Sequence, residues 1–121
     1  MALRSNSNYK TGKLGEQKAL EFLKSKGYHL LEKNLRLGHW ELDFLMVFQN
    51  QLIAIEVKTK TRNQKFLRNP FRSNQLKRVS KIASQYATKN QLNYPIQIDG
   101  LIVCLETRTI THLENLFFPG L

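Results

Sequence analysis

The sequence predicts a single α/β (α+β) domain in which helices pack on a central mixed β-sheet, in the order α-β-β-β-α-β-β. Two apolar runs, 40–48 and 51–59, are separated only by Gln49-Asn50, as in a β-hairpin. The segment 73–90 instead repeats its apolar residues with a helical period. No internal repeat, proline-rich linker or low-complexity tract divides the 121 residues, so one domain is expected.

The first elements follow from local patterns. A helix is expected over 9–26, because its apolar residues recur with a helical period and Gly27 can end it. Residues 1–8 are expected to form a flexible N-terminal tail. A strand over 28–36 follows the helix and ends in a turn at Gly38, after which the two apolar runs form the second and third strands.

The second half of the chain begins with a polar, basic segment, 60–72, which is expected to be irregular. Ser73 can cap the next helix, which runs to about Asn90. The apolar stripe of this helix consists of Leu76, Val79, Ile82, Ala83 and Tyr86. A long apolar strand is expected over 95–105, and a final edge strand over 107–116.

The charge balance is strongly positive. Lysine and arginine number 19 and aspartate and glutamate 9, so the formal net charge is +10. Such an excess favours a polyanionic partner, which could be nucleic acid, an anionic membrane surface or an acidic protein. Nucleic acid is the partner that we expect. A hydrophobic content of 41% indicates a folded chain rather than a disordered one.

The sequence predicts a cytoplasmic protein. Cys104, the single cysteine, lies in an apolar run and is expected to be a small buried hydrophobe, which suits a reducing compartment. Residues 1–6 lack the apolar core of a signal peptide. No apolar stretch approaches the ~18 residues that would cross a bilayer, so no membrane association is expected.

Acidic residues are expected to meet at one end of the central hairpin. Counting outward from the turn places Asp43 opposite Glu56 and Glu41 opposite Lys58. Because side chains alternate along a strand, Asp43, Glu56 and Lys58 share one face. Both faces of the hairpin are otherwise mostly apolar, so the acidic pair is expected at the end of a largely buried element.

This arrangement is costly without a cation. Directly opposed residues have Cβ atoms about 5 Å apart, so like charges repel each other there, and desolvation adds to the cost. A divalent cation between the carboxylates would offset both, and Mg²⁺ prefers one or two carboxylates together with water and phosphate oxygens. The alternative is a charge-balanced surface network of Glu41, Lys58 and the two acids.

A third carboxylate is expected nearby. Glu16 lies on the small, apolar face of the first helix, so its side chain is expected to point toward the sheet. Gly12 and Gly15 would let the helix backbone approach the sheet closely. The alternative is a salt bridge from Glu16 to Lys58 or Arg36.

Several motifs run through these segments. They are Gly12, Gly15-Glu16, Ala19, Leu23 and Gly27-Tyr28, then Asn34-Leu35-Arg36, Glu41-Leu42-Asp43 and Ile55-Glu56-Val57-Lys58-Thr59, then Lys77 and Asp99. Together they resemble the YraN-like (UPF0102) family of uncharacterised bacterial proteins over nearly the whole chain. That family is similar to the PD-(D/E)xK nuclease superfamily, which includes archaeal Holliday-junction resolvases. The resemblance implies a restriction-endonuclease-like fold and a single nuclease-like domain over 9–121.

The resemblance also implies roles for the acidic cluster. Asp43 and Glu56 would bind Mg²⁺ or Mn²⁺, and Glu16 would be a further ligand, direct or through water. Lys58 would orient or activate the attacking water and stabilise charge on the phosphate. The implied function is that of a magnesium-dependent endonuclease, with DNA favoured over RNA and with the number of metals and a homodimer left open. The rival is a non-catalytic nucleic-acid-binding module on the same fold.

A basic surface adjoins the predicted site. The nucleic-acid-binding residues are expected to be Lys60, Arg62, Lys65, Arg72, Lys77 and Arg78. Phe66 and Phe71 could stack on bases, but the favoured interpretation is that they pin this segment to the core. No helix-turn-helix, zinc-finger or RNP motif occurs, so sequence-specific readout is not expected.

Trp40 stands where the related family usually has a glycine. It could crowd the entrance to the site or serve as a stacking platform for a base. The favoured interpretation is that the indole belongs to the core.

Overall fold

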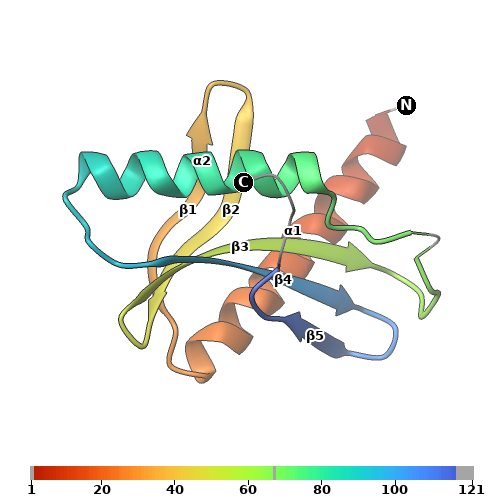
Figure 1. Ribbon diagram of the computed structural model, residues 1–121. Helices are drawn as coiled ribbons and strands as arrows, with labels where there is room; N and C mark the ends of the chain where they lie inside the picture. The colour runs from red at the N-terminus through yellow and green to blue at the C-terminus, as the bar shows by residue number, and fades with distance from the viewer. Residues whose placement is uncertain (1, 67, 117–121) are drawn as a thin grey trace.

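The computed structural model describes residues 2–66 and 68–116, with side chains described from Asn8 onward. Over these ranges the elements follow the predicted order α-β-β-β-α-β-β (Figure 1). They are α1 (Ala2–Ser25), β1 (His29–Leu37), β2 (Trp40–Phe48), β3 (Gln51–Lys60), α2 (Ser73–Lys89), β4 (Ile96–Cys104) and β5 (Thr109–Leu113). The predicted mixed α/β architecture is therefore confirmed.

The five strands form one mixed sheet in chain order, β1-β2-β3-β4-β5. The first three strands are antiparallel, β3 and β4 are parallel, and β5 returns antiparallel to β4. A parallel pair needs a long crossover connection, and the segment that contains α2 supplies it. Figure 1 shows α2 lying across one face of the sheet while α1 runs behind it.

The hydrophobic core has two parts because the sheet separates the helices. Leu45 and Ala54 belong to the part that includes the apolar stripe of α2. Phe44 and Ile55 belong to the other part, with Ala19 of α1. Both faces of the central hairpin are therefore covered, as the apolar pattern of its strands predicted.

Turn residues fix the hairpin register and the end of the first helix. Gln49 and Asn50 have φ of 50° and 61°, and two positive φ values suit the right-handed twist of a tight hairpin. The resulting register pairs Leu45 with Ala54, as predicted. Gly27, with φ 93°, ends α1, and the next N–H, of Tyr28, donates to Leu23 O at 3.0 Å.

The first helix is longer than expected. It begins at Ala2, so it includes the backbone of residues 2–8, which the sequence predicted as a flexible tail. Ala2 and Leu3 favour helical conformation, and no glycine or proline interrupts the chain before Gly12. No helix within 2–66 or 68–116 is long and apolar enough to cross a membrane.

Two other boundaries differ from the predictions. Ser73 does not cap α2: the N-cap position belongs to Arg72, whose side chain makes no capping hydrogen bond. The final strand is shorter than 107–116, because a turn with Arg108 at φ 55° precedes it and Asn115 has the same φ after it. The last part of the predicted domain, 117–121, lies outside the described residues.

Candidate functional site

The backbone ladder between β2 and β3 runs from the hairpin turn as far as the pair Phe44–Ile55. Beyond this pair, carboxylate oxygens accept the hydrogen bonds that join the two strands. The N–H of Asp43 donates to Glu56 Oε1 at 3.1 Å, and the N–H of Val57 donates to Asp43 Oδ2 at 2.8 Å. The predicted juxtaposition of Asp43 and Glu56 is confirmed by this reciprocal pair of hydrogen bonds.

The outer end of β2 pairs with β1 rather than with β3. Glu41 lies opposite Arg36 in the ladder, and their side chains form an ion pair of 3.1 Å. The expected pairing of Glu41 with Lys58 is absent from the β2–β3 ladder over the described residues. In the alternative network, Glu41 therefore pairs with Arg36 rather than with Lys58, whereas the charge of Lys58 still acts on Asp43 and Glu56 and opposes the rise of both pKa values.

Glu56 is held from the α2 side of the sheet. Its side chain is 5% exposed, and Gln75 Nε2 in the first turn of α2 donates to Oε2 at 2.8 Å. Both carboxylate oxygens of Glu56 therefore accept hydrogen bonds. Gln75 was not among the predicted site residues, because its only signal in the sequence is a polar residue next to the apolar stripe of α2.

Burial shifts the protonation of both acids toward the neutral form. It raises the pKa of Asp43 to about 7, with Glu16 and Glu41 adding to the rise and the Val57 N–H and Lys58 opposing it. Burial likewise raises the pKa of Glu56 to about 8, and the nearby Asp43 adds to that rise. The pair therefore retains a proton near neutral pH unless another cation compensates its charge.

A cleft of about 820 Å³ opens where β2 and β3 part. Its walls come from the first half of α1, the outer ends of β1 and β2, and the end of β3. Asp43, Lys58 and Glu16 all line it. Glu56 is outside the lining and lies behind Asp43, where Gln75 holds it.

Glu16 points into this cleft, as predicted, but the three acids do not form one cluster. No group of three histidine, cysteine or acidic side chains among the described residues could hold a metal ion as they stand. The reason lies in the two layers of helices: Glu16 comes from α1 on one face, whereas Glu56 is hydrogen-bonded to α2 on the other. Neither Glu16 nor Lys58 forms an ion pair in the part of the chain that the structure describes.

A glycine sets how closely α1 approaches the sheet. A Cβ added to Gly15 would overlap the side chain of Thr59 on β3, so the close approach predicted at this position is confirmed. Gly12 has open space instead, so the prediction fails there because that turn of α1 borders the cleft. The contact at Gly15 positions the neighbouring Glu16 at the cleft wall.

The predicted nucleic-acid-binding residues occupy the loop after β3 and the start of α2. Lys60 Nζ donates to Gln64 O at 2.8 Å and lies 5.2 Å from the centre of the Phe66 ring. The others are exposed except for the half-buried Lys77. They are Arg62, Lys65, Arg72, Lys77 and Arg78.

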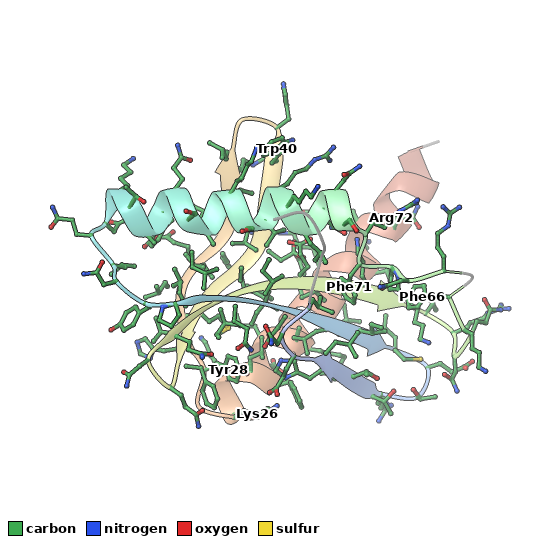
Figure 2. All side chains as sticks on the ribbon, viewed as in Figure 1. Lys26, Tyr28, Trp40, Phe66, Phe71 and Arg72 are labelled. Carbon is green, nitrogen blue, oxygen red and sulfur yellow. The ribbon has the colours of Figure 1, made fainter. Side chains whose placement is uncertain are left out.

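The aromatic residues of this region divide between core and surface. Phe71 is buried against the backbone of Gly100 on β4, so it pins the loop as expected, whereas Phe66 is exposed (Figure 2). Trp40 packs partly on the α2 side of the core and does not line the cleft, so it does not crowd the site. Arg78 and Lys81 lie 5.6 and 5.8 Å from the centre of its ring.

A second polar cluster lies between the end of α1 and the last two strands. Asp99 on β4 is fully buried and accepts hydrogen bonds from Gln97 Nε2, Asn115 N and His112. His112 Nε2 lies 2.8 Å from Asp99 Oδ2, and His112 Nδ1 lies 3.0 Å from Lys26 Nζ. The resemblance had marked Asp99 alone; His112 was missed because its partners are distant in sequence.

Comparison with known proteins places these features in a family. Residues 15–103 match the model of the family described as Uncharacterised protein family UPF0102. Similar UPF0102 proteins occur in Clostridioides difficile (39% identity, 92% of this chain and 99% of the relative), Thermodesulfovibrio yellowstonii (34%, 88% and 95%) and Bacteroides thetaiotaomicron (33%, 91% and 93%). The matched span contains Glu16, Asp43, Glu56 and Lys58.

Proposed function

The chain belongs to the UPF0102 family of uncharacterised proteins, and from its cleft we propose that it is a magnesium-dependent endonuclease that hydrolyses phosphodiester bonds without reading sequence. The observation that carries the proposal is the Asp43–Glu56 pair at the point where β2 and β3 separate. Asp43 borders an open cleft that Lys58 also lines. The mixed sheet with a helix on each face is compatible with a restriction-endonuclease-like fold.

The chemistry of the donor set fits a divalent cation. Burial keeps Asp43 and Glu56 from ionising at their usual pH, and a bound cation would offset that penalty. Mg²⁺ needs only one or two carboxylates when water and phosphate complete its shell, so a cluster of three acids is not required. When bound, Mg²⁺ or Mn²⁺ would polarise a phosphate oxygen and lower the pKa of a water molecule.

Residues of the chain would hold the ion, bind the phosphate and orient the attacking water. Asp43 and Glu56 would hold the ion, and Gln75 would keep Glu56 in position through its 2.8 Å hydrogen bond. Lys58 lines the cleft beside Asp43, so its ammonium would meet a phosphate oxygen or the attacking water there. Glu16, on the opposite wall, would orient water rather than complete a compact metal cluster.

The charge distribution suits a nucleic acid. The net charge is +10, and Arg62, Lys65 and Arg72 are exposed on the segment that leaves β3 beside the cleft. Cations next to the site would hold the phosphate backbone and would not read bases, and we favour DNA over RNA as the partner. A cytoplasmic location is part of the proposal, because Cys104 is a free, buried thiol.

The direct test is a cleavage assay on single-stranded, duplex and branched nucleic acids with EDTA, Mg²⁺ or Mn²⁺. We expect cleavage only with a divalent cation, and we expect Lys58→Ala to lose cleavage while Mn²⁺ still stabilises the fold. Lys24→Ala, at the far end of α1, is the matched control and should cleave normally. Cleavage in EDTA, or normal cleavage by Lys58→Ala, would contradict the proposed roles.

One observation favours the rival, a non-catalytic nucleic-acid-binding module. The oxygens of Asp43 and Glu56 already accept backbone and amide hydrogen bonds, and the described acids form no three-residue metal cluster. In that case the pair would serve only to hold β2 against β3. Stabilisation of the fold by a divalent cation separates the two functions.

A further inference from the structure

An exposed aromatic ring stands at the cleft. Tyr9 on α1 is 64% exposed, more than any other large hydrophobic residue in the described structure, and it lines the cleft with Lys13. Lys13 follows one turn later on the same helix, and its Nζ lies 5.4 Å from the centre of the Tyr9 ring. A ring and a cation on one wall can contact a base and a phosphate of the same strand.

A second pair of the same kind lies in a hollow that adjoins the cleft at Thr61. Phe66 is exposed, Lys60 Nζ lies 5.2 Å from its ring centre, and both line a hollow of about 310 Å³. Thr61 lines this hollow and also the main cleft, so the two depressions adjoin. The surface therefore presents one aromatic ring and a lysine in the cleft that Asp43 and Lys58 line, and a second ring and lysine in the adjoining hollow.

The two rings are set apart from other exposed apolar side chains by their place in a depression. Leu14 and Tyr94, which are also exposed, line none of the depressions described here, whereas Tyr9 and Phe66 both line one. The faces of bases are covered in a duplex but available in a single strand. Stacking is therefore open to unpaired bases of any sequence, while lysines beside the rings meet the backbone.

We propose that Tyr9–Lys13 in the cleft and Phe66–Lys60 in the adjoining hollow bind unpaired bases of a strand whose phosphate lies in the cleft. The site then takes a single strand, or an unpaired segment, in preference to continuous duplex. Whether the phosphodiester is cleaved rests on the proposed nuclease function. The preference for an unpaired strand does not rest on it, because binding needs neither metal nor cleavage.

The test is a fluorescence binding titration in EDTA with a short single strand, the same strand carrying abasic positions, and the matching duplex. We expect the intact single strand to bind more tightly than the other two. Tyr9→Ala and Phe66→Ala should each weaken single-strand binding about tenfold, with duplex binding unchanged. Tyr9→Phe should bind as the wild type, since it keeps the ring.

Leu14→Ala is the matched control, because it removes an exposed apolar side chain of the same helix outside the cleft lining, and it should bind normally. Equal affinities for the three ligands, no binding at all, or normal single-strand binding by Tyr9→Ala would overturn the inference. Ring-dependent binding without cleavage in Mg²⁺ or Mn²⁺ would uphold it and remove the nuclease proposal. Metal-dependent cleavage that is unchanged in Tyr9→Ala and Phe66→Ala would uphold the nuclease proposal and overturn the inference about the rings.

Discussion

Asp43 and Glu56 join β2 to β3 by two hydrogen bonds in which a carboxylate oxygen of one strand accepts a backbone N–H of the other. Asp43 N–H donates to Glu56 Oε1, and Val57 N–H donates to Asp43 Oδ2. These bonds close the ladder at the point where β2 turns away with β1, and Asp43 lines the cleft there while Glu56 lies outside its lining. The same two groups therefore hold the sheet together and carry the buried acidity that a cation would relieve.

The first prediction concerns pH. Burial raises the pKa of Asp43 from 3.8 to about 7 and that of Glu56 from 4.5 to about 8. Between these limits the folded state binds more protons at the pair than the unfolded state does, so metal-free stability falls as pH rises. Asp43→Asn removes part of this dependence and should be more stable than wild type at pH 8 but not at pH 4.

Urea unfolding of both proteins in EDTA across this pH range provides the measurement. The difference between wild type and Asp43→Asn isolates the pair, because the other titrating groups are common to both. We expect a difference on the order of a few kcal/mol at pH 8. A wild type whose advantage over the mutant grows with pH would show that Asp43 is stabilised as an anion.

Local patterns predicted the sheet and its central register, because alternation along 40–48 and 51–59 has one consistent solution around Gln49-Asn50. They placed Asp43 beside Glu56 for the same reason. They did not predict that β2 leaves β3 at Asp43, because that depends on contacts with β1 and not on the alternation within the hairpin. Glu16 reaches the cleft without meeting Glu56 because Glu16 comes from α1 on one face of the sheet, whereas Gln75 of α2 holds Glu56 on the other.

Long-range partners were equally hidden from the sequence. Gln75 and His112 each hold a buried carboxylate, but each comes from the element that follows that of its partner, 19 and 13 residues along the chain, so no pattern within one element reveals the contact. Ser73 was misassigned as a cap, since capping depends on the backbone of the preceding loop and Arg72 occupies that position. Sequence patterns therefore predict the individual elements better than they predict the contacts between elements.

The second prediction concerns the close approach of α1 to β3. Gly15→Ala would force the helix away from Thr59 and should lower the free energy of unfolding by about 1–3 kcal/mol. Gly12→Ala, one turn earlier, meets open space and should be neutral or stabilising by up to ~1 kcal/mol. Chemical denaturation of the two variants is the measurement, and equal effects would contradict a steric role for Gly15.

The third prediction concerns the buried carboxylate of Asp99. His112→Ala removes the partner of Oδ2 while Gln97 and Asn115 remain on Oδ1, so stability should fall by about 1–3 kcal/mol. Lys26→Ala removes only the exposed end of the same chain of contacts and should cost less than ~1 kcal/mol. Thermal melts compare the two; a larger loss in Lys26→Ala would place the important contact at the surface instead.

The fourth prediction concerns the basic surface. Nucleic-acid affinity should fall steeply with salt, because each neutralised phosphate releases a counterion. Arg62→Ala with Lys65→Ala should flatten the logarithmic slope by about 0.9 for each duplex phosphate contact that is lost. The control removes the same charge elsewhere, with Lys24→Ala and Lys89→Ala. If the control flattens the slope as much, net charge rather than this loop governs binding.

The fifth prediction separates the enzyme from the binding module. Asn at position 43 can still accept the Val57 N–H, so Asp43→Asn keeps the strand contact but loses the charge that would hold a cation. We therefore expect Mn²⁺ to stabilise the wild type, by about 2.7 kcal/mol at a hundredfold excess over its dissociation constant, and to leave Asp43→Asn unchanged. Glu41→Gln is the matched control, because this acid pairs with Arg36 and should retain the Mn²⁺ effect.

Melting curves of the three proteins with EDTA and with Mn²⁺ decide the outcome. A binding module in which ionised Asp43 balances a protein cation predicts no Mn²⁺ effect in wild type and a loss of a few kcal/mol in Asp43→Asn, because a partly buried cation would lose its partner. The enzyme predicts the opposite, since the raised pKa of Asp43 means that its charge costs stability in the absence of metal. A wild type that does not respond to Mn²⁺, together with a severely destabilised Asp43→Asn, would therefore exclude the nuclease and leave the module.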